Sequence, residues 1–279
     1  MTTETLSETR AHGGTQGVYR HASTATGTDM TLAVFVPEHQ AGAQLPVLWY
    51  LSGLTCTHAN VMEKGEYRAA CAEHGVIFVA PDTSPRGDDV PDSDGYDFGQ
   101  GAGFYVDATQ QPWARHYRMY DYIVEELPAL IEQHFPVSAI KSIAGHSMGG
   151  HGAITIGLKN TAQYRSISAF SPISNPMQCP WGQKAFTAYL GADRESWRQY
   201  DACELLKAKQ SLLPLLVDQG DADNFLEQQL QPQRLMDAAQ ASGSTLELRM
   251  QAAYDHSYFF ISSFIEEHLD FHAQYLFKK

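Results

Sequence analysis

Short apolar segments alternate with longer amphipathic segments along most of the chain. Residues 18–23 and 30–37 form two such apolar or alternating runs around a TGTD turn, which predicts an antiparallel hairpin at a sheet edge. Further apolar runs predict strands at residues 45–53, 75–82, 141–145, 166–170, 212–220 and 245–250. Apolar residues at helical spacing predict helices at residues 60–74, 117–134, 148–159 and 224–241, and a terminal helix from Ser257.

This alternation predicts an α/β fold with a mostly parallel central sheet that helices flank on both faces. Residues 1–13 are polar and predict a flexible N-terminal tail, because nothing apolar ties them down, and residues 14–279 are predicted to form a single domain. Residues 83–114 are rich in Gly, Asp and Pro without a helix or strand period, which is typical of a functional loop.

Charge and cysteine usage narrow the classes of partner. A net charge of −13 with only 19 Lys and Arg argues against nucleic acid or an anionic membrane, and favours a small-molecule partner. The chain has no apolar stretch of about 18 residues and no basic start followed by an apolar run, so we expect a cytoplasmic protein. The cysteines lie far apart, without CxxC or zinc spacing, which predicts free thiols and neither a metal nor another cofactor: Cys56, Cys71, Cys179 and Cys203.

The segment GHSMGG at residues 145–150 links a predicted strand to a predicted helix, which is the context of a nucleophile elbow. In such a turn the residues two before and two after the serine must lack side chains, and Gly145 and Gly149 satisfy this requirement. Ser147 is therefore the candidate nucleophile. The alternative is a glycine-rich helix start in which Ser147 only caps the helix.

A serine nucleophile needs a base, which on this fold follows the nucleophile and the acid in the chain. His256 follows the last predicted strand and its loop, where a base can reach the strand ends. His146 and His151 flank the elbow and are expected to point into the sheet or the helix packing. His268 and His272 lie within the terminal amphipathic helix. His256 is therefore the candidate base.

Three aspartates near the end of the strand at 212–220 compete for the role of the acid that orients the base. Asp218 falls within the strand, whereas Asp221 and Asp223 follow it. Asp223 is favoured because it lies in the loop, three residues past Gly220, where it is free to turn toward the strand ends. These positions predict an α/β-hydrolase fold with a Ser-His-Asp triad.

Hydrolysis by a serine also needs two backbone N–H groups that stabilise the oxyanion. The residue after the nucleophile, Met148, supplies one. Leu54 is the natural source of the second because it follows the strand at 45–53, and Gly53 allows the backbone to approach closely.

Several longer motifs extend beyond these residues: LSGLTCTHAN, APDTSPRG, DFGQGAGFYVDAT, GHSMGGHGA, NPMQCPWGQKAF and YDHSYFFI. With them the chain, from about residue 14 onward, resembles the S-formylglutathione hydrolase family, also called esterase D. The resemblance implies the triad Ser147, Asp223 and His256, with oxyanion donors at Leu54 and Met148. It further implies hydrolysis of S-formylglutathione to glutathione and formate in formaldehyde detoxification, side activity on short-chain esters, and a cytosolic, often dimeric enzyme without a metal.

Candidates for the walls of the acyl pocket and the glutathione groove are Cys179, Trp181 and the loop at residues 83–113, and Cys56 is a further candidate for a substrate-binding residue near the site. Cys56 lies two residues past Leu54 in the chain. Core packing is the alternative for Trp181 and Cys179, because tryptophan and cysteine are usually buried.

Other functions remain open at this stage. A general short-chain carboxylesterase, or an acyltransferase that passes the acyl group to an alcohol, would share the elbow and the triad. A binding module on a hydrolase scaffold is a third reading, although such proteins commonly lose a triad member. The aspartates within residues 88–97 suggest a metal-dependent hydrolase, but no HExxH or histidine cluster accompanies them.

Overall fold

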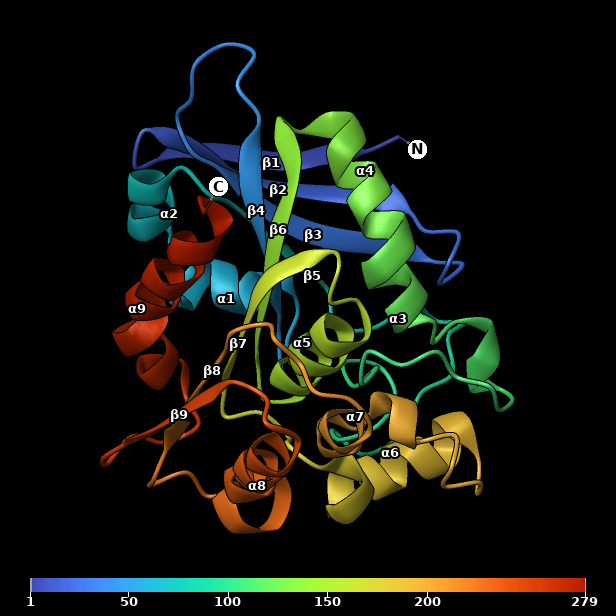
Figure 1. Cartoon of the computed structure of the whole chain (residues 1–279). Coiled ribbons are helices and arrows are strands. Elements are labelled where there is room, and N and C mark those ends of the chain that lie inside the picture. The colour runs from blue at the N-terminus through green and yellow to red at the C-terminus, as the bar shows by residue number, and fades with distance from the viewer. Residues whose placement is uncertain (1, 279) are drawn as a thin grey trace.

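The computed structural model describes residues 2–278, and within this range nine strands form one sheet in the order β1-β2-β3-β5-β4-β6-β7-β8-β9 (Figure 1). The strands are β1 Glu4–Ala11, β2 Gly14–Ala22, β3 Asp29–Val36, β4 Leu45–Leu51, β5 Ile77–Pro81, β6 Val137–His146, β7 Tyr164–Phe170, β8 Leu215–Gly220 and β9 Leu246–Gln251. The α-helices are α1 His58–Lys64, α2 Arg68–His74, α3 Met119–Asp121, α4 Leu127–His134, α5 Met148–Lys159, α6 Pro180–Leu190, α7 Ala202–Ala208, α8 Pro232–Ser242 and α9 Tyr258–Leu276.

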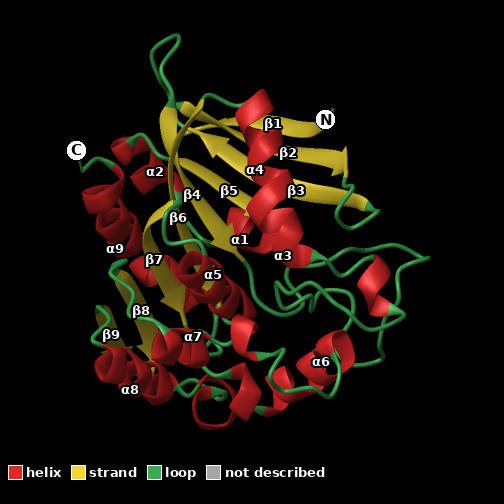
Figure 2. Ribbon diagram, turned by 45° about the vertical axis from the view of Figure 1, so that its right-hand side comes forward, coloured by secondary structure: helices red, strands yellow, loops and turns green. Residues whose placement is uncertain are grey.

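The pairing of the strands confirms a mostly parallel sheet with an antiparallel edge. Strands β1, β2, β3 and β5 pair antiparallel, and the strands from β5 across β4 to β9 pair parallel. Helices α1, α2 and α9 cover one face, and α4, α5 and α8 lie on the other (Figures 1 and 2). The central strands are buried on both sides, which explains why they are apolar without alternation.

The prediction of a flexible tail is wrong for residues 4–11. They form β1, which pairs with β2 from Glu4↔Arg20 to Ala11↔Gly14. The side chains of this edge strand are almost all exposed, so hydropathy does not reveal it. Backbone hydrogen bonds hold the strand in place, and the Tyr19 hydroxyl adds a hydrogen bond to Glu8 Oε1 at 2.8 Å.

Two predicted helices are interrupted. The helix expected at residues 60–74 is divided into α1 and α2, because the chain turns at Gly65 and at Glu66, whose φ of 55° is left-handed. The helix expected at residues 224–241 begins instead as a π-helical turn at Leu226–Leu230, and Pro232 then starts α8.

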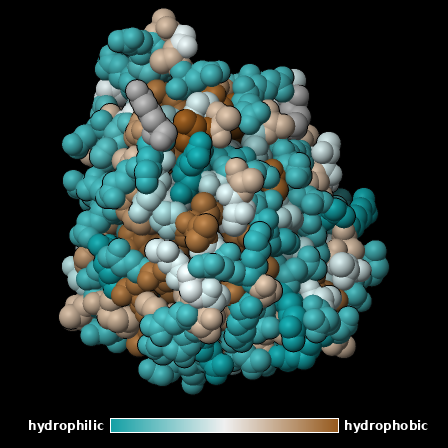
Figure 3. All heavy atoms as spheres, in the orientation of Figure 1, coloured by the Kyte–Doolittle hydropathy of each residue, from teal (hydrophilic) through white to brown (hydrophobic). Residues whose placement is uncertain are grey.

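Parallel strands place the turns that follow them at one edge of the sheet, so the turns after β6, β8 and β9 share that edge. The face of the molecule shown in Figure 3 is mostly hydrophilic, with hydrophobic areas interrupted by polar residues. Among residues 2–278, no helix combines the length and apolar character that crossing a membrane requires.

Candidate active site

Ser147 lies on a strained turn between β6 and α5. Its φ of 57° and ψ of −120° are rare for a residue with a side chain, and such strain requires support from the surroundings. A Cβ on Gly149 would overlap with the Leu51 carbonyl, and one on Gly145 would overlap with the Gly149 carbonyl. Ser147 makes no side-chain capping bond to α5, so its hydroxyl is free for another partner.

That partner is His256, which follows β9. The distance from His256 Nε2 to Ser147 Oγ is 2.9 Å, and the distance from His256 Nδ1 to Asp223 Oδ2 is 2.6 Å. The three side chains therefore form one hydrogen-bonded chain, delivered by the turns after β6, β8 and β9. This is the connectivity in which a carboxylate fixes the tautomer of an imidazole that can accept a serine proton.

The Asp223 carboxylate is held in its charged form. Burial favours the neutral acid, but hydrogen bonds from His256 and from the Phe225 backbone N–H outweigh burial, so the pKa of Asp223 lies below its ordinary value. Gln219 Nε2 donates a further hydrogen bond to Oδ2 at 3.2 Å. Asp223 is therefore ready to orient His256 at neutral pH.

The two competing aspartates have other partners. Asp218 is buried in β8, where both of its carboxylate oxygens accept hydrogen bonds from Arg249 at 2.6 Å. Asp221 is exposed and accepts a hydrogen bond from the Ala253 backbone N–H at 2.6 Å. Neither reaches His256, so the structure brings Asp223 alone of the three to the base.

A small cavity opens beside the serine hydroxyl, and we refer to it as the active-site cavity. Its volume is about 220 Å³. Apolar and aromatic side chains make up most of its wall, which is formed by Gly53, Leu54, Thr55, Tyr96, His146, Ser147, Trp181, Phe225 and His256. A site of this size accepts a short acyl group next to the nucleophile.

The sequence matches the Esterase family model, described as "Putative esterase", over residues 23–271. It is also 50% identical, over 98% of both chains, to the S-formylglutathione hydrolase of Paracoccus denitrificans (strain Pd 1222). The chain belongs to the S-formylglutathione hydrolase family. It is an ester-hydrolysing enzyme of the α/β-hydrolase fold, as the sequence motifs predict.

Solved structures agree with this membership. A structure of an S-formylglutathione hydrolase from Agrobacterium tumefaciens superposes on this esterase with a TM-score of 0.96, at 53% identity, and covers 98% of this chain and 99% of that chain. An S-formylglutathione hydrolase from Staphylococcus aureus, at 18% identity and a TM-score of 0.72 over 98% of this chain and 100% of that chain, shares the fold.

Two backbone N–H groups of this esterase remain available beside Ser147. Met148 is the first residue of α5, so its N–H has no intrahelical acceptor. Among the residues that the structure describes, neither Met148 N nor Leu54 N donates a hydrogen bond, whereas the next amide, Thr55 N, donates to the Gly101 carbonyl at 2.9 Å. Leu54 also lines the active-site cavity, as expected for an oxyanion donor.

The remaining predicted pocket residues separate into two groups. Trp181 lines the active-site cavity, and Tyr96, from the loop at residues 83–113, packs edge-on against it with ring centroids 6.3 Å apart. Cys179, expected as a wall of the acyl pocket or the glutathione groove, is buried and is not among the cavity residues, and Cys56, expected near the site, directly follows the cavity residues Leu54 and Thr55 but is itself buried outside the wall. Cys179 precedes α6 with its thiol directed toward the Pro176 carbonyl, 3.9 Å away.

The structure corrects the expected orientation of His146 and adds Phe225. His146 lines the active-site cavity instead of pointing away from it, and its ring centroid lies 4.5 Å from that of His256. Burial holds the pKa of His146 well below its usual value, so this imidazole is neutral. Phe225 lies two residues after Asp223 in the chain, and its ring centroid is 5.1 Å from that of His256. Only this closeness to Asp223 in the sequence could have indicated that Phe225 lines the cavity.

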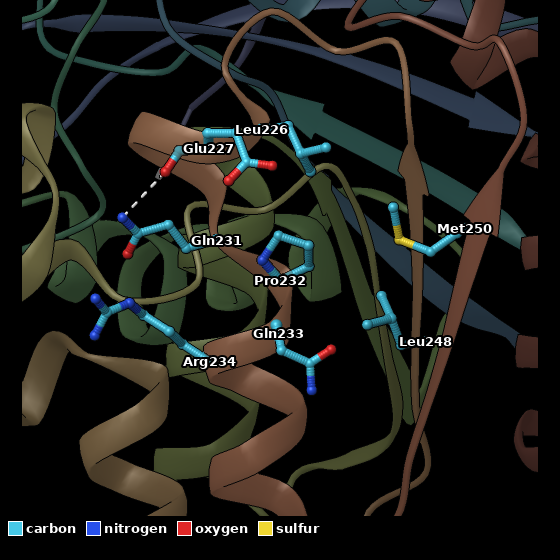
Figure 4. A pocket seen from close by; sticks show the side chains of 8 residues that line it. All are labelled: Leu226, Glu227, Gln231, Pro232, Gln233, Arg234, Leu248 and Met250. Atoms are coloured by element: carbon cyan, nitrogen blue, oxygen red, sulfur yellow. Dashed lines mark hydrogen bonds between the residues drawn. The ribbon is translucent and has the colours of Figure 1, made fainter.

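A larger cavity of about 480 Å³ lies between α8 and β9 and contains none of the three hydrogen-bonded side chains (Figure 4). Its wall includes Glu227, Arg234 and Met250. Within residues 2–278, no three His, Cys, Asp or Glu side chains cluster as a set of metal ligands. The aspartates of residues 88–97 form no such cluster either.

Proposed function

We propose that the chain hydrolyses S-formylglutathione to glutathione and formate, with side activity on short-chain esters. The observation that carries this proposal is the hydrogen-bonded chain from Asp223 through His256 to Ser147, which opens into a cavity of about 220 Å³. A cavity of this size suits a formyl group better than a long acyl chain. The names of the relatives from P. denitrificans and A. tumefaciens support the thioester as substrate.

The reaction proceeds in two steps. Ser147 Oγ attacks the formyl carbon while His256 accepts the hydroxyl proton, and the carbon–sulfur bond breaks to release the glutathione thiolate, which takes up that proton and returns His256 to its neutral form. Water then attacks the formyl-serine ester with His256 as the base. Formate leaves and Ser147 regains its proton. Because a thiolate leaves more easily than an alkoxide, protonation by His256 matters less in the first step than in the second.

The oxyanion of each tetrahedral intermediate needs donors that are already in place. We assign this role to the backbone N–H groups of Met148 and Leu54, which have no acceptor in the described chain. Removing one such donor typically costs about 2.7 to 4 kcal/mol of transition-state stabilisation. Gly53 approaches the strained turn so closely that a Cβ added to it would lie 3.0 Å from that of Ser147, which brings the segments that carry the two donors together.

The substrate is tested by comparing kcat/KM for S-formylglutathione with kcat/KM for p-nitrophenyl acetate and p-nitrophenyl octanoate. We expect a strong preference for the formyl thioester, and a lower value for the octanoate than for the acetate because the cavity is small. A preference for the esters would instead identify a general short-chain carboxylesterase. Acyl transfer to an added alcohol, detected by product analysis, would identify an acyltransferase.

We also propose that the enzyme works in the cytoplasm as a homodimer. All four cysteines are free and buried, as suits a reducing compartment. The dimer rests on the family resemblance, and light scattering should then give twice the chain mass of 30.9 kDa. A particle with the mass of one chain would contradict it.

A further inference from the structure

A second cavity lies next to the active-site cavity, on the other side of the segment that carries His256. Its volume is about 570 Å³. We name it the Lys64 cavity, and its wall is formed by Lys64, Glu66, Ser257, Tyr258, Phe259 and Ser262. His256 lines one cavity and the next residue, Ser257, lines the other, so a single short segment borders both cavities.

The same two chain segments border both cavities. Leu54 and Thr55 line the active-site cavity, and the residue that follows them, Cys56, lies beside the hydroxyl of Tyr258, which lines the Lys64 cavity. Lys64 ends α1, Phe259 and Ser262 lie on α9, and these two helices pack against each other (Figure 1). The Lys64 cavity therefore borders the active-site cavity through two shared chain segments.

The Lys64 cavity contains two charges without partners. Lys64 and Glu66 are both exposed, and neither makes a hydrogen bond or ion pair with any residue of the described range 2–278, including each other. Lys64 lies near the shared wall: burial raises the pKa of the Cys56 thiol, and the positive charge of Lys64 partly opposes this effect. One cation and one anion, both free, provide complementary partners for a ligand that carries both an ammonium and a carboxylate.

An exposed aromatic side chain completes the cavity. Phe259 is 84% exposed, on the first turn of α9 and three residues after His256. Ligand-binding surfaces often contain a large apolar side chain that is exposed to water and lines a cavity. It offers an apolar surface for the methylene groups of a ligand whose ends are charged.

We propose that the Lys64 cavity binds the γ-glutamyl end of the glutathione part of the substrate. Lys64 binds the α-carboxylate, Glu66 binds the α-ammonium, and Phe259 packs against the methylene groups between them. The γ-glutamyl end of an extended tripeptide lies about 10 Å from the central sulfur, which suits a subsite that adjoins the nucleophile. This inference rests on the proposed thioesterase function and names the residues that recognise the leaving thiol.

The direct test is the binding of glutathione, measured as competitive inhibition of p-nitrophenyl acetate hydrolysis. In Lys64→Gln we expect the inhibition constant of glutathione to rise about tenfold, because a charged hydrogen-bond partner is lost. Hydrolysis of p-nitrophenyl acetate itself should not change. Glutathione diethyl ester, which lacks both carboxylates, should inhibit the wild type and Lys64→Gln equally. Glu66→Gln and Phe259→Ala should weaken inhibition by glutathione to a smaller extent.

Two further variants serve as controls. Lys209→Gln removes an exposed lysine on the opposite face of the sheet and should leave the inhibition constant unchanged. Arg234→Gln tests the cavity of Figure 4 as the competing location. An unchanged inhibition constant in Lys64→Gln, or a rise confined to Arg234→Gln, would overturn the assignment.

Hydrolysis of S-formylglutathione separates this inference from the proposed function. We expect Lys64→Gln to raise KM about tenfold while kcat stays near that of the wild type, because the lost contact is distant from the reacting carbon. If the wild type does not hydrolyse S-formylglutathione, the proposed function fails. The inhibition experiment with glutathione still decides whether the subsite exists.

Discussion

Replacing Ser147 with alanine should lower kcat for both thioester and ester substrates by about 10⁶-fold, because the covalent route is lost with the hydroxyl. The geometry that supports this expectation is the 2.9 Å contact between Ser147 Oγ and His256 Nε2 on a turn that places the serine 2% exposed at the cavity floor. The measurement is the steady-state rate with S-formylglutathione and p-nitrophenyl acetate.

The variant should remain folded, since alanine removes one oxygen atom and adds no atom to the crowded turn. Thermal unfolding of Ser147→Ala should therefore match the wild type to within a few degrees. Ser263→Ala, on the exposed side of α9, is the matched control and should keep full activity. A folded Ser147→Ala enzyme that retains even about 1% of the wild-type rate would exclude Ser147 as the nucleophile.

Replacing Asp223 with asparagine should lower kcat by about 10⁴-fold, because an amide can donate to His256 Nδ1 and so favours the wrong tautomer. The aspartate carries out its role as a carboxylate. Its pKa is held below the ordinary value by the hydrogen bonds that outweigh its burial, so Asp223 should stay charged and its protonation should not limit the rate at pH 5 and above. Rates at pH 5 to 9 test this range.

Asp221→Asn provides the control for this assignment. Asp221 is exposed and accepts a hydrogen bond from the Ala253 N–H, and it does not contact His256. The kcat of Asp221→Asn should therefore lie within about twofold of the wild-type kcat. A larger loss in Asp221→Asn than in Asp223→Asn would transfer the role of the acid to Asp221.

The parts of the fold that the sequence predicts well are those whose burial leaves a pattern. Strands such as β4 and β5 are buried on both faces, so each appears as an unbroken apolar run. Strand β1 has no such signal, because its side chains face water and its stability comes from backbone pairing with β2. A hydropathy pattern reflects side-chain burial, so it cannot indicate an edge strand whose side chains are exposed.

The candidate site is predictable to the extent that chain order constrains it. The glycines around Ser147 indicate the elbow, and chain order favours His256 as the base and limits the acid to the aspartates near the end of β8, of which loop position and the family resemblance together favour Asp223. The structure brings all three together. The walls of the cavity are not predictable in this way, because Tyr96, Trp181 and Phe225 come from loops whose meeting depends on tertiary packing.

His146 shows a further limit. In a regular strand the side chains of neighbouring residues point to opposite faces of the sheet, so His146 is expected to point away from Ser147. The positive φ of Ser147 ends this alternation, and the His146 ring lies against that of His256. No period of two or of 3.6 residues applies across such a turn. The turn that exposes the serine therefore also defeats pattern-based placement of the residue next to it.

The 109 residues that separate Ser147 from His256 affect when the enzyme can first act during its synthesis. The ribosome adds Ser147 well before His256, which follows β9 in the chain, and in the finished sheet β8 lies beside β7 and β9 beside β8. A partly synthesised chain therefore lacks the proposed base. We expect activity to appear only after the C-terminal strands have been made, so that it reports the completion of the fold.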